Sequence, residues 1–275
     1  MKKATTHLGF TFLALLFVAT ACKQEKKASE EKETTVDTTE VETPTTPPEI
    51  TLQKLEGSPA YADASLLLDT PQHIKVAEVG EVDFSFAVEN YELGKQTEGP
   101  NAQSLANSGK GQHIHFILDN QPYSAHYEPI FQKEIPAGTH HLVAFLSRSY
   151  HESVKNENSV IVRKLTVGDT TKDTLDFDLK APTLIYSRPK GTYKGKDTEQ
   201  ILLDFFVLNT TLSESGTKVR TTINGKQFMV EEWVPHVIKG LPMGEVTIQL
   251  ELTDTSGNLI PGPFNSVTRK VTLEP

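Results

Sequence analysis

Histidine is the residue type in this chain whose number and spacing could bind a metal ion. Six of the nine histidines lie between residues 113 and 151. A β-strand would place His113 and His115 on one face, a spacing that suits zinc or copper, with His141 as the predicted third ligand. Histidines also commonly pack or hydrogen-bond beneath a loop, and that alternative stays open. Further candidate ligands are His126, Glu128, His151 and Glu152.

The segment 147–153 combines serine, histidine and glutamate, the residue types of nucleophilic catalysis. Serine and histidine this close on a turn rarely reach triad geometry, so we predict a loop in which Arg148 and Glu152 tie neighbouring strands. Arg148 and His151 could alternatively bind an anionic or sugar ligand. EF-hand, P-loop, CxxC and GxSxG motifs are missing from the sequence. The sequence therefore predicts no enzyme.

The chain contains an internal repeat. Comparing the two copies distinguishes the residues that the fold requires from those peculiar to one copy. GQHIHFILDNQPY at 111–123 aligns with GTKVRTTINGKQF at 216–228, and IPAG at 135–138 aligns with LPMG at 241–244. Upstream, LLLDTPQ at 66–72 aligns with LIYSRPK at 184–190. Two copies of one domain are the simplest explanation.

Short alternating or β-branched runs separated by turn residues recur along both copies. This pattern predicts an all-β chain of two tandem immunoglobulin-like antiparallel β-sandwiches, at 57–168 and 177–275. The first copy carries an insertion at 94–112 that the second lacks. Ser58 before Pro59 favours a short helix reaching Ser65.

The regular alternation of the second copy fixes which side chains of the first face outward. Val246, Ile248 and Leu250 point into the core of the second copy, so the aligned residues of the first copy should also point inward. The residues between them should point outward, because side chains alternate along a strand. The predicted outward patch comprises His113, His115, Ile117, His141, Val143 and Phe145. Since the second copy has polar residues at these positions, we expect the patch to be covered by the insertion, the second domain or an outside partner.

Residues 1–22 have the form of a signal peptide. Lys2 and Lys3 precede an apolar run too short to span a bilayer, and small residues lead to Cys22, the only cysteine. We expect lipidation of Cys22, which would anchor the chain to a membrane. Residues 23–49 contain no aromatic residue and many charged ones, a composition typical of a disordered tether.

The charge of the chain argues against a nucleic-acid partner. The formal charge of −9 includes +2 from Lys2 and Lys3 and −4 from residues 23–49, which leaves −7 on residues 50–275. Nucleic-acid-binding domains generally present a basic stripe, which an acidic chain of this kind lacks.

Four segments are distinctive: SPAYADA at 58–64, NYELGKQT at 90–97, GQHIHFILDNQPYSAHYEP at 111–129 and FLSRSYHES at 145–153. They resemble a family of uncharacterised bacterial lipoproteins, some of which carry the label phosphopeptide-binding. The resemblance implies an outer-membrane lipoprotein of the bacterial cell envelope, without an established activity. Two functions are predicted: binding of a protein or glycan partner through the first domain with no cofactor, or binding of zinc or copper by His113, His115 and His141.

Overall fold

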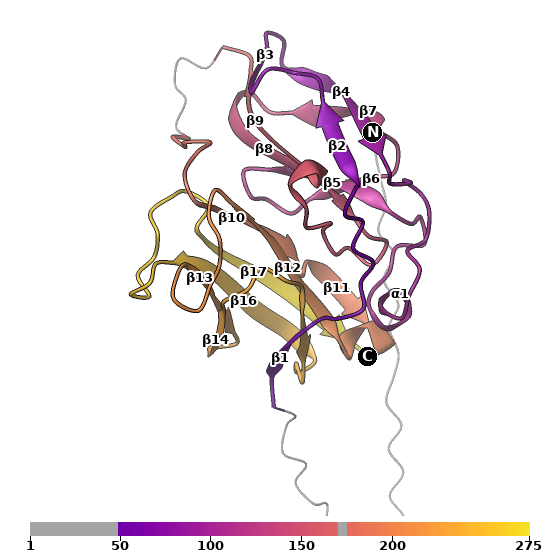
Figure 1. The fold of residues 1–275 in the computed structure, drawn as a ribbon, viewed down its shortest axis with the longest axis vertical. Helices are drawn as coiled ribbons and strands as arrows, with labels where there is room; N and C mark the ends of the chain where they lie inside the picture. The colour runs from indigo at the N-terminus through magenta and orange to yellow at the C-terminus, as the bar shows by residue number, and fades with distance from the viewer. Residues whose placement is uncertain (1–48, 170–174) are drawn as a thin grey trace, which may run out of the picture. The chain divides into compact units, whose positions relative to one another are not determined.

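The computed structural model describes residues 49–169 and 175–275 (Figure 1). The predicted signal peptide, Cys22 and all but the last residue of the predicted tether lie outside these ranges. Within the described ranges, no helix is long and apolar enough to cross a membrane.

The first sandwich packs a three-stranded sheet against a five-stranded sheet. Its alternating strands place Phe84, Phe86, Ile114, Phe116 and Leu142 in one shared core. The smaller sheet is β2 (Ser65–Leu68), β4 (Gly80–Glu89) and β7 (Ile130–Ile135). The larger, in spatial order, is β3 (His73–Val76), β9 (Val160–Val167), β8 (Gly138–Ser147), β5 (His113–Leu118) and β6 (Ser124–His126).

The second sandwich packs a four-stranded sheet against a five-stranded sheet around its own core, which includes Tyr186, Phe205, Ile248 and Leu250. One sheet is β1 (Thr51–Lys54), β15 (His236–Lys239), β12 (Ile201–Leu208) and β10 (Thr183–Arg188). The other is β11 (Gly191–Lys194), β17 (Ser266–Glu274), β16 (Gly244–Thr253), β13 (Lys218–Ile223) and β14 (Lys226–Val230).

The two five-stranded sheets have the same strand order, and the predicted fold of two tandem immunoglobulin-like sandwiches is confirmed. Each sheet also contains one parallel pair at its edge, β3 with β9 and β11 with β17, where the sequence predicted antiparallel strands only. The remaining pairs in both sheets are antiparallel.

Helices are few in the described ranges, and the helix predicted from Ser58 to Ser65 does not form. Residues 58–64 contain no helix, and β2 begins at Ser65. The single α-helix, α1 (Asn101–Ser104), lies instead in the insertion of the first copy. Two 3-10 turns cover Glu157–Ser159 and Gly195–Thr198. Serine before proline is a common helix start, but here Tyr61 has a φ of +48°, outside the right-handed helical region.

The outward patch of the first sandwich is covered by the second. Ile117, Val143 and Phe145 are completely buried against Ile185, Phe206 and Leu208 of β10 and β12. The Phe145 and Phe206 rings lie 4.9 Å apart. Strand β12 is therefore buried on both faces, one toward its own core and one toward the first sandwich.

Strand β1 belongs to the second sandwich although it precedes the first in the chain. It pairs antiparallel with β15, from Thr51 opposite Lys239 to Lys54 opposite His236. In Figure 1 the indigo β1 extends the sheet of orange strands. Residues 50–56 fall in neither predicted domain, because nothing in a four-residue strand indicates its partner.

Removing the Phe145 side chain should destabilise the protein, because the ring fills the contact between the sandwiches. Phe145→Ala should lower the free energy of unfolding by about 3–5 kcal/mol. The matched control is Ile130→Ala on β7, whose side chain is 69% exposed and should change stability by less than about 0.5 kcal/mol. Urea unfolding measures both, and equal effects would contradict the burial of the patch.

Candidate functional site

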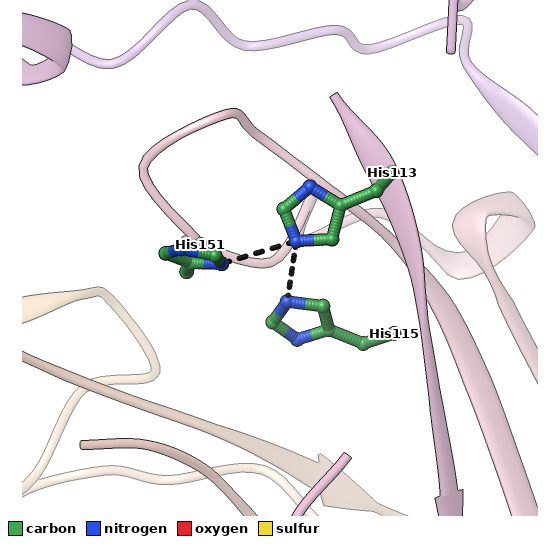
Figure 2. A group of neighbouring side chains, drawn as sticks. All are labelled: His113, His115 and His151. Carbon is green, nitrogen blue, oxygen red and sulfur yellow. Dashed lines mark hydrogen bonds between the residues drawn. The ribbon is translucent and has the colours of Figure 1, made fainter. Parts of the chain in front are cut away.

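Three histidines converge at the edge of this contact. His113 Nε2 lies 2.9 Å from His115 Nε2 and 3.1 Å from His151 Nδ1. One nitrogen from each ring lies within 4.8 Å of the other two. Figure 2 shows the rings turned toward one another, with His113 and His115 on a strand and His151 on a loop. His113 and His115 are completely buried, and His151 is half-buried.

The sheet register brings the loop histidine to the strand histidines. His113 is paired with Ser147, the last residue of β8, so the loop that follows β8 begins beside His113. A bridge between Ser147 and Ser153 closes this loop. His151 N donates to Arg148 O at 2.9 Å, and Arg148 N donates to Glu152 O at 2.8 Å, which fixes His151 in the turn.

The repeat shows that His151 occupies a position where the backbone favours glycine. Its φ is +70°, and the equivalent residue of the second copy, Gly257, has φ of +80°. Both turns have the same backbone hydrogen bonds, since Gly257 N donates to Asp254 O as His151 N donates to Arg148 O. A side chain in this region costs about 1 kcal/mol or more, so the fold alone does not explain histidine here.

A hydrogen bond at the outer side of the His113 ring leaves its inner nitrogen free to accept. His113 Nδ1 lies 2.8 Å from Gly111 O, a carbonyl that only accepts, so the proton of neutral His113 is on Nδ1 and Nε2 carries a lone pair. His115 Nδ1 lies 3.1 Å from Ser187 Oγ. Such outer partners are typical of histidines that bind metals, because they fix ring orientation and tautomer.

All three imidazoles are neutral at physiological pH. Burial lowers the pKa of His113 to about 4, although the hydrogen bond to Gly111 acts in the opposite direction. Burial also lowers the pKa of His115 and of His151 far below the usual histidine range, and the charges of Arg188 and Lys190 add to the effect. Neutral imidazole is the form that coordinates a metal ion, so at neutral pH the ion need not displace the second proton of an imidazolium.

His141 does not join the cluster, although it shares the outward parity of His113 and His115. Its carbonyl accepts from Asp119 N, which places it six residues along β5 from His113, or about 20 Å. Its ring packs against those of Phe177 and Phe264, at 5.0 and 5.1 Å. The predicted set His113, His115 and His141 is thus replaced in the structure by one containing His151.

The other candidate residues of the sequence analysis have structural contacts. Arg148 Nη1 forms a buried ion pair with Glu152 at 2.9 Å and donates to Ser153 O at 2.8 Å. Ile117, Val143 and Phe145 are covered by the second sandwich, so they offer no surface to an outside partner.

Sequence reasoning missed several residues that surround the cluster. The Tyr123 ring stacks on His115 at 3.5 Å, and its hydroxyl lies 3.1 Å from His151 Nδ1. Ser187 and Lys190 come from the second sandwich, so no local pattern in the first copy could indicate them. The alignment of 66–72 with 184–190 did distinguish Lys190, because the first copy has the neutral Gln72 at the equivalent position.

Comparisons with known proteins give distant matches only. No protein-family model matches the chain, and no curated protein matches it. The fibronectin(III)-like modules of Clostridium thermocellum CbhA are 13% identical over 76% of this chain and 94% of that one, with a TM-score of 0.27. SGBP-B of the Bacteroides ovatus mixed-linkage glucan utilization locus, solved with a mixed-linkage heptasaccharide, is 12% identical over 76% of this chain and 47% of that one, with a TM-score of 0.23. The central fibronectin-III array of RIM-binding protein is 9% identical over 77% and 68%, also at 0.23. Similarity this low says nothing about ligand or activity.

The protein should lose stability as the pH falls from about 6.5 to about 4. Burial lowers the pKa of His141 to about 4, although Asp119 opposes the shift, so between these pH values the unfolded chain binds a proton that the folded chain does not. In His141→Phe, the decrease in unfolding free energy over this range should be smaller by about 3 kcal/mol. Urea unfolding at several pH values tests this. The exposed His73→Gln serves as control, and an unchanged pH slope in His141→Phe would disprove the assignment.

Proposed function

We propose that this protein is a metal-binding module of the bacterial cell envelope, with zinc or copper bound by His113, His115 and His151. The observation that carries the proposal is the convergence of three neutral imidazole nitrogens from a strand and a loop, at 2.9 and 3.1 Å. Imidazole is the ligand type that suits zinc and copper, and three such ligands leave a fourth position.

The spacing of the nitrogens fits a common metal ligand set. Two nitrogens at about 2.0–2.1 Å from a tetrahedral ion are about 3.4 Å apart. The separations of 2.9 and 3.1 Å from His113 need only small ring movements to reach this value, while the nitrogens of His115 and His151 lie within 4.8 Å of each other. The fourth position adjoins His151, where the Tyr123 hydroxyl oxygen is 3.1 Å from Nδ1. This oxygen or a water molecule would complete the coordination.

Two cations near the cluster weaken but do not prevent metal binding. Arg188 and Lys190 act on all three histidines electrostatically. Repulsion of a divalent ion by each charge is about 1–4 kcal/mol at the effective dielectric of a protein. Structural zinc typically contributes about 10–16 kcal/mol, so an affinity below that of a zinc finger is expected.

The burial of the site favours metal retention over catalysis. His113 and His115 are closed off by their own sandwich on one side and by Ser187 of the second on the other. An outside protein or glycan partner on the same patch is disfavoured, because Ile117, Val143 and Phe145 are already covered.

Replacing His151 by the residue of the second copy should remove the metal site and keep the turn. His151→Gly should bind Co²⁺, a spectroscopic substitute for zinc, at least about 100-fold more weakly, because it loses one of three ligands. Without metal, its stability should equal or exceed that of the unchanged protein by about 1 kcal/mol, since glycine adopts positive φ freely.

The matched control for this titration is His126→Gln. His126 lies on β6, is half-buried, and stacks on Phe131 at 3.5 Å outside the cluster. The unchanged protein and His126→Gln should each bind one Co²⁺ with the visible spectrum of a tetrahedral site. Equal binding by His151→Gly, or binding by none of the three, would refute the proposal.

We also propose that Cys22 carries the lipid that holds the module at the outer membrane. The support is the placement of the only cysteine directly after a signal-like segment. Cys22→Ser should abolish the lipid adduct and release the protein from the membrane fraction. Mass spectrometry of the mature N-terminus measures this, and an unmodified terminus at any other residue would contradict it.

A further inference from the structure

Three basic side chains gather where the second sandwich meets the first. Arg188 ends β10, Lys190 follows it, and Arg269 lies on β17. Both arginines are less than 9% exposed, and Lys190 is half-buried. Within the described ranges, no carboxylate lies within ion-pair distance of any of the three.

The partners of these cations are neutral. Lys190 Nζ donates to Tyr123 O at 2.7 Å and lies 3.7 Å from the centre of the Tyr123 ring. Arg269 donates to Ser187 O at 3.2 Å and to Asn120 O at 3.0 Å. Such partners orient the cations without cancelling their charge.

Arg188 has unused hydrogen-bonding capacity as well as uncancelled charge. Its Nη1 donates to the Tyr193 hydroxyl at 3.0 Å, while its buried Nε has no hydrogen-bond partner among the described residues. A buried charge without a counter-charge is costly, and proteins rarely keep one without a use.

The cations disturb one another, which shows that they share one environment. Burial lowers the pKa of Lys190 to about 8, and Arg188 and Arg269 add to the effect. Burial likewise lowers the pKa of Arg269 to about 10, with Arg188 contributing. Both sites would be more stable with a negative charge nearby.

The repeat shows that the fold does not require two of these cations. Arg188 and Lys190 align with Thr70 and Gln72 of the first copy, at the same point of the same sandwich. A neutral pair therefore satisfies this turn. Arg269, by contrast, aligns with Arg163, so that arginine belongs to the common framework.

A hollow of about 550 Å³ lies against this cluster. Lys190, Arg269 and Lys270 line it together with Asn120 and Thr268, and no aspartate or glutamate does. Lys270 is at the exposed rim, where it pairs with Glu245 at 2.8 Å. The volume lies within the range of small-molecule sites and greatly exceeds that of an inorganic ion.

We propose that this hollow binds a small organic dianion, whose acidic groups are held by Lys190 and Arg269 at the junction of the sandwiches. Charge-assisted hydrogen bonds to carboxylate or sulfate oxygens would supply the missing negative charge. The site uses none of the three clustered histidines as a ligand, so it stands independently of the proposed metal function.

The test is calorimetric titration of the full, metal-free chain with succinate, sulfate and the uncharged analogue succinamide. Succinate should bind saturably at one site, and succinamide should not bind. Lys190→Gln, the residue of the first copy, should weaken succinate binding at least tenfold, which is about 1.4 kcal/mol. Lys196→Gln, on the exposed turn Gly195–Thr198, is the control and should bind as the unchanged protein does.

The competing outcomes are distinguishable. Weaker binding of sulfate than of succinate supports an organic ligand. Binding of sulfate without binding of succinate would indicate an inorganic anion site and overturn the proposal. Equal responses of Lys190→Gln and the unchanged protein would show a general salt effect and also overturn it. Because Lys190→Gln could disturb the turn, its thermal unfolding is recorded first. If it is misfolded, Lys190→Met, which keeps the length of the side chain without its charge, takes its place with the same expected loss.

Discussion

The contact between the outer face of β5 and β8 and the outer face of β10 and β12 sets the conditions for both proposed sites. It excludes water from Ile117, Val143, Phe145 and Phe206. Asn120, from the first sandwich, hydrogen-bonds to Leu184 O, Phe264 O and Tyr186 N of the second, which fixes the relative position of the facing strands. Burial and register together hold side chains accurately enough for ligands to be bound between the sandwiches.

The same contact explains the electrostatic state of the region. Burial keeps His113, His115 and His151 neutral while Arg188 and Lys190 remain charged beside them. Tyr123 contacts members of both groups, stacking on His115 and lying beneath Lys190. Negative charge bound near Lys190 would reduce the repulsion felt by a metal ion at the histidines. Linkage then requires that a bound metal strengthen anion binding by the same factor.

The fold and the direction of the patch could be predicted because side-chain parity is local and the second copy displays it clearly. Ile114 and Phe116 enter the first core, whereas Ile117 faces the second sandwich. Parity gives the face of a residue but not its position along the strand, which depends on register. His141 has the correct face and the wrong position, whereas His151 reaches His113 through the Ser147 pairing.

Other features could not be predicted because they depend on contacts between distant parts of the chain. The burial of Arg188 and Lys190 requires the first sandwich, although their departure from Thr70 and Gln72 was visible in the alignment. The left-handed backbone at His151 could not be predicted from the first copy alone. Gly257 at the equivalent position indicates it, but only once the two turns are known to have the same backbone hydrogen bonds. Residues that the fold alone does not need can be identified by comparing each copy with the other, position by position.

The pairing of β1 with β15 has a consequence for the order in which the chain can fold. Thr51 pairs with Lys239, so the sheet of the second sandwich cannot be completed until most of the chain is available to fold. Contacts between residues this distant in sequence slow folding, because the entropy of closing the long loop is lost before the contacts can stabilise the fold. Until then the first sandwich would be exposed with Val143 and Phe145 uncovered, a period in which a chaperone that recognises apolar strands would have its binding surface.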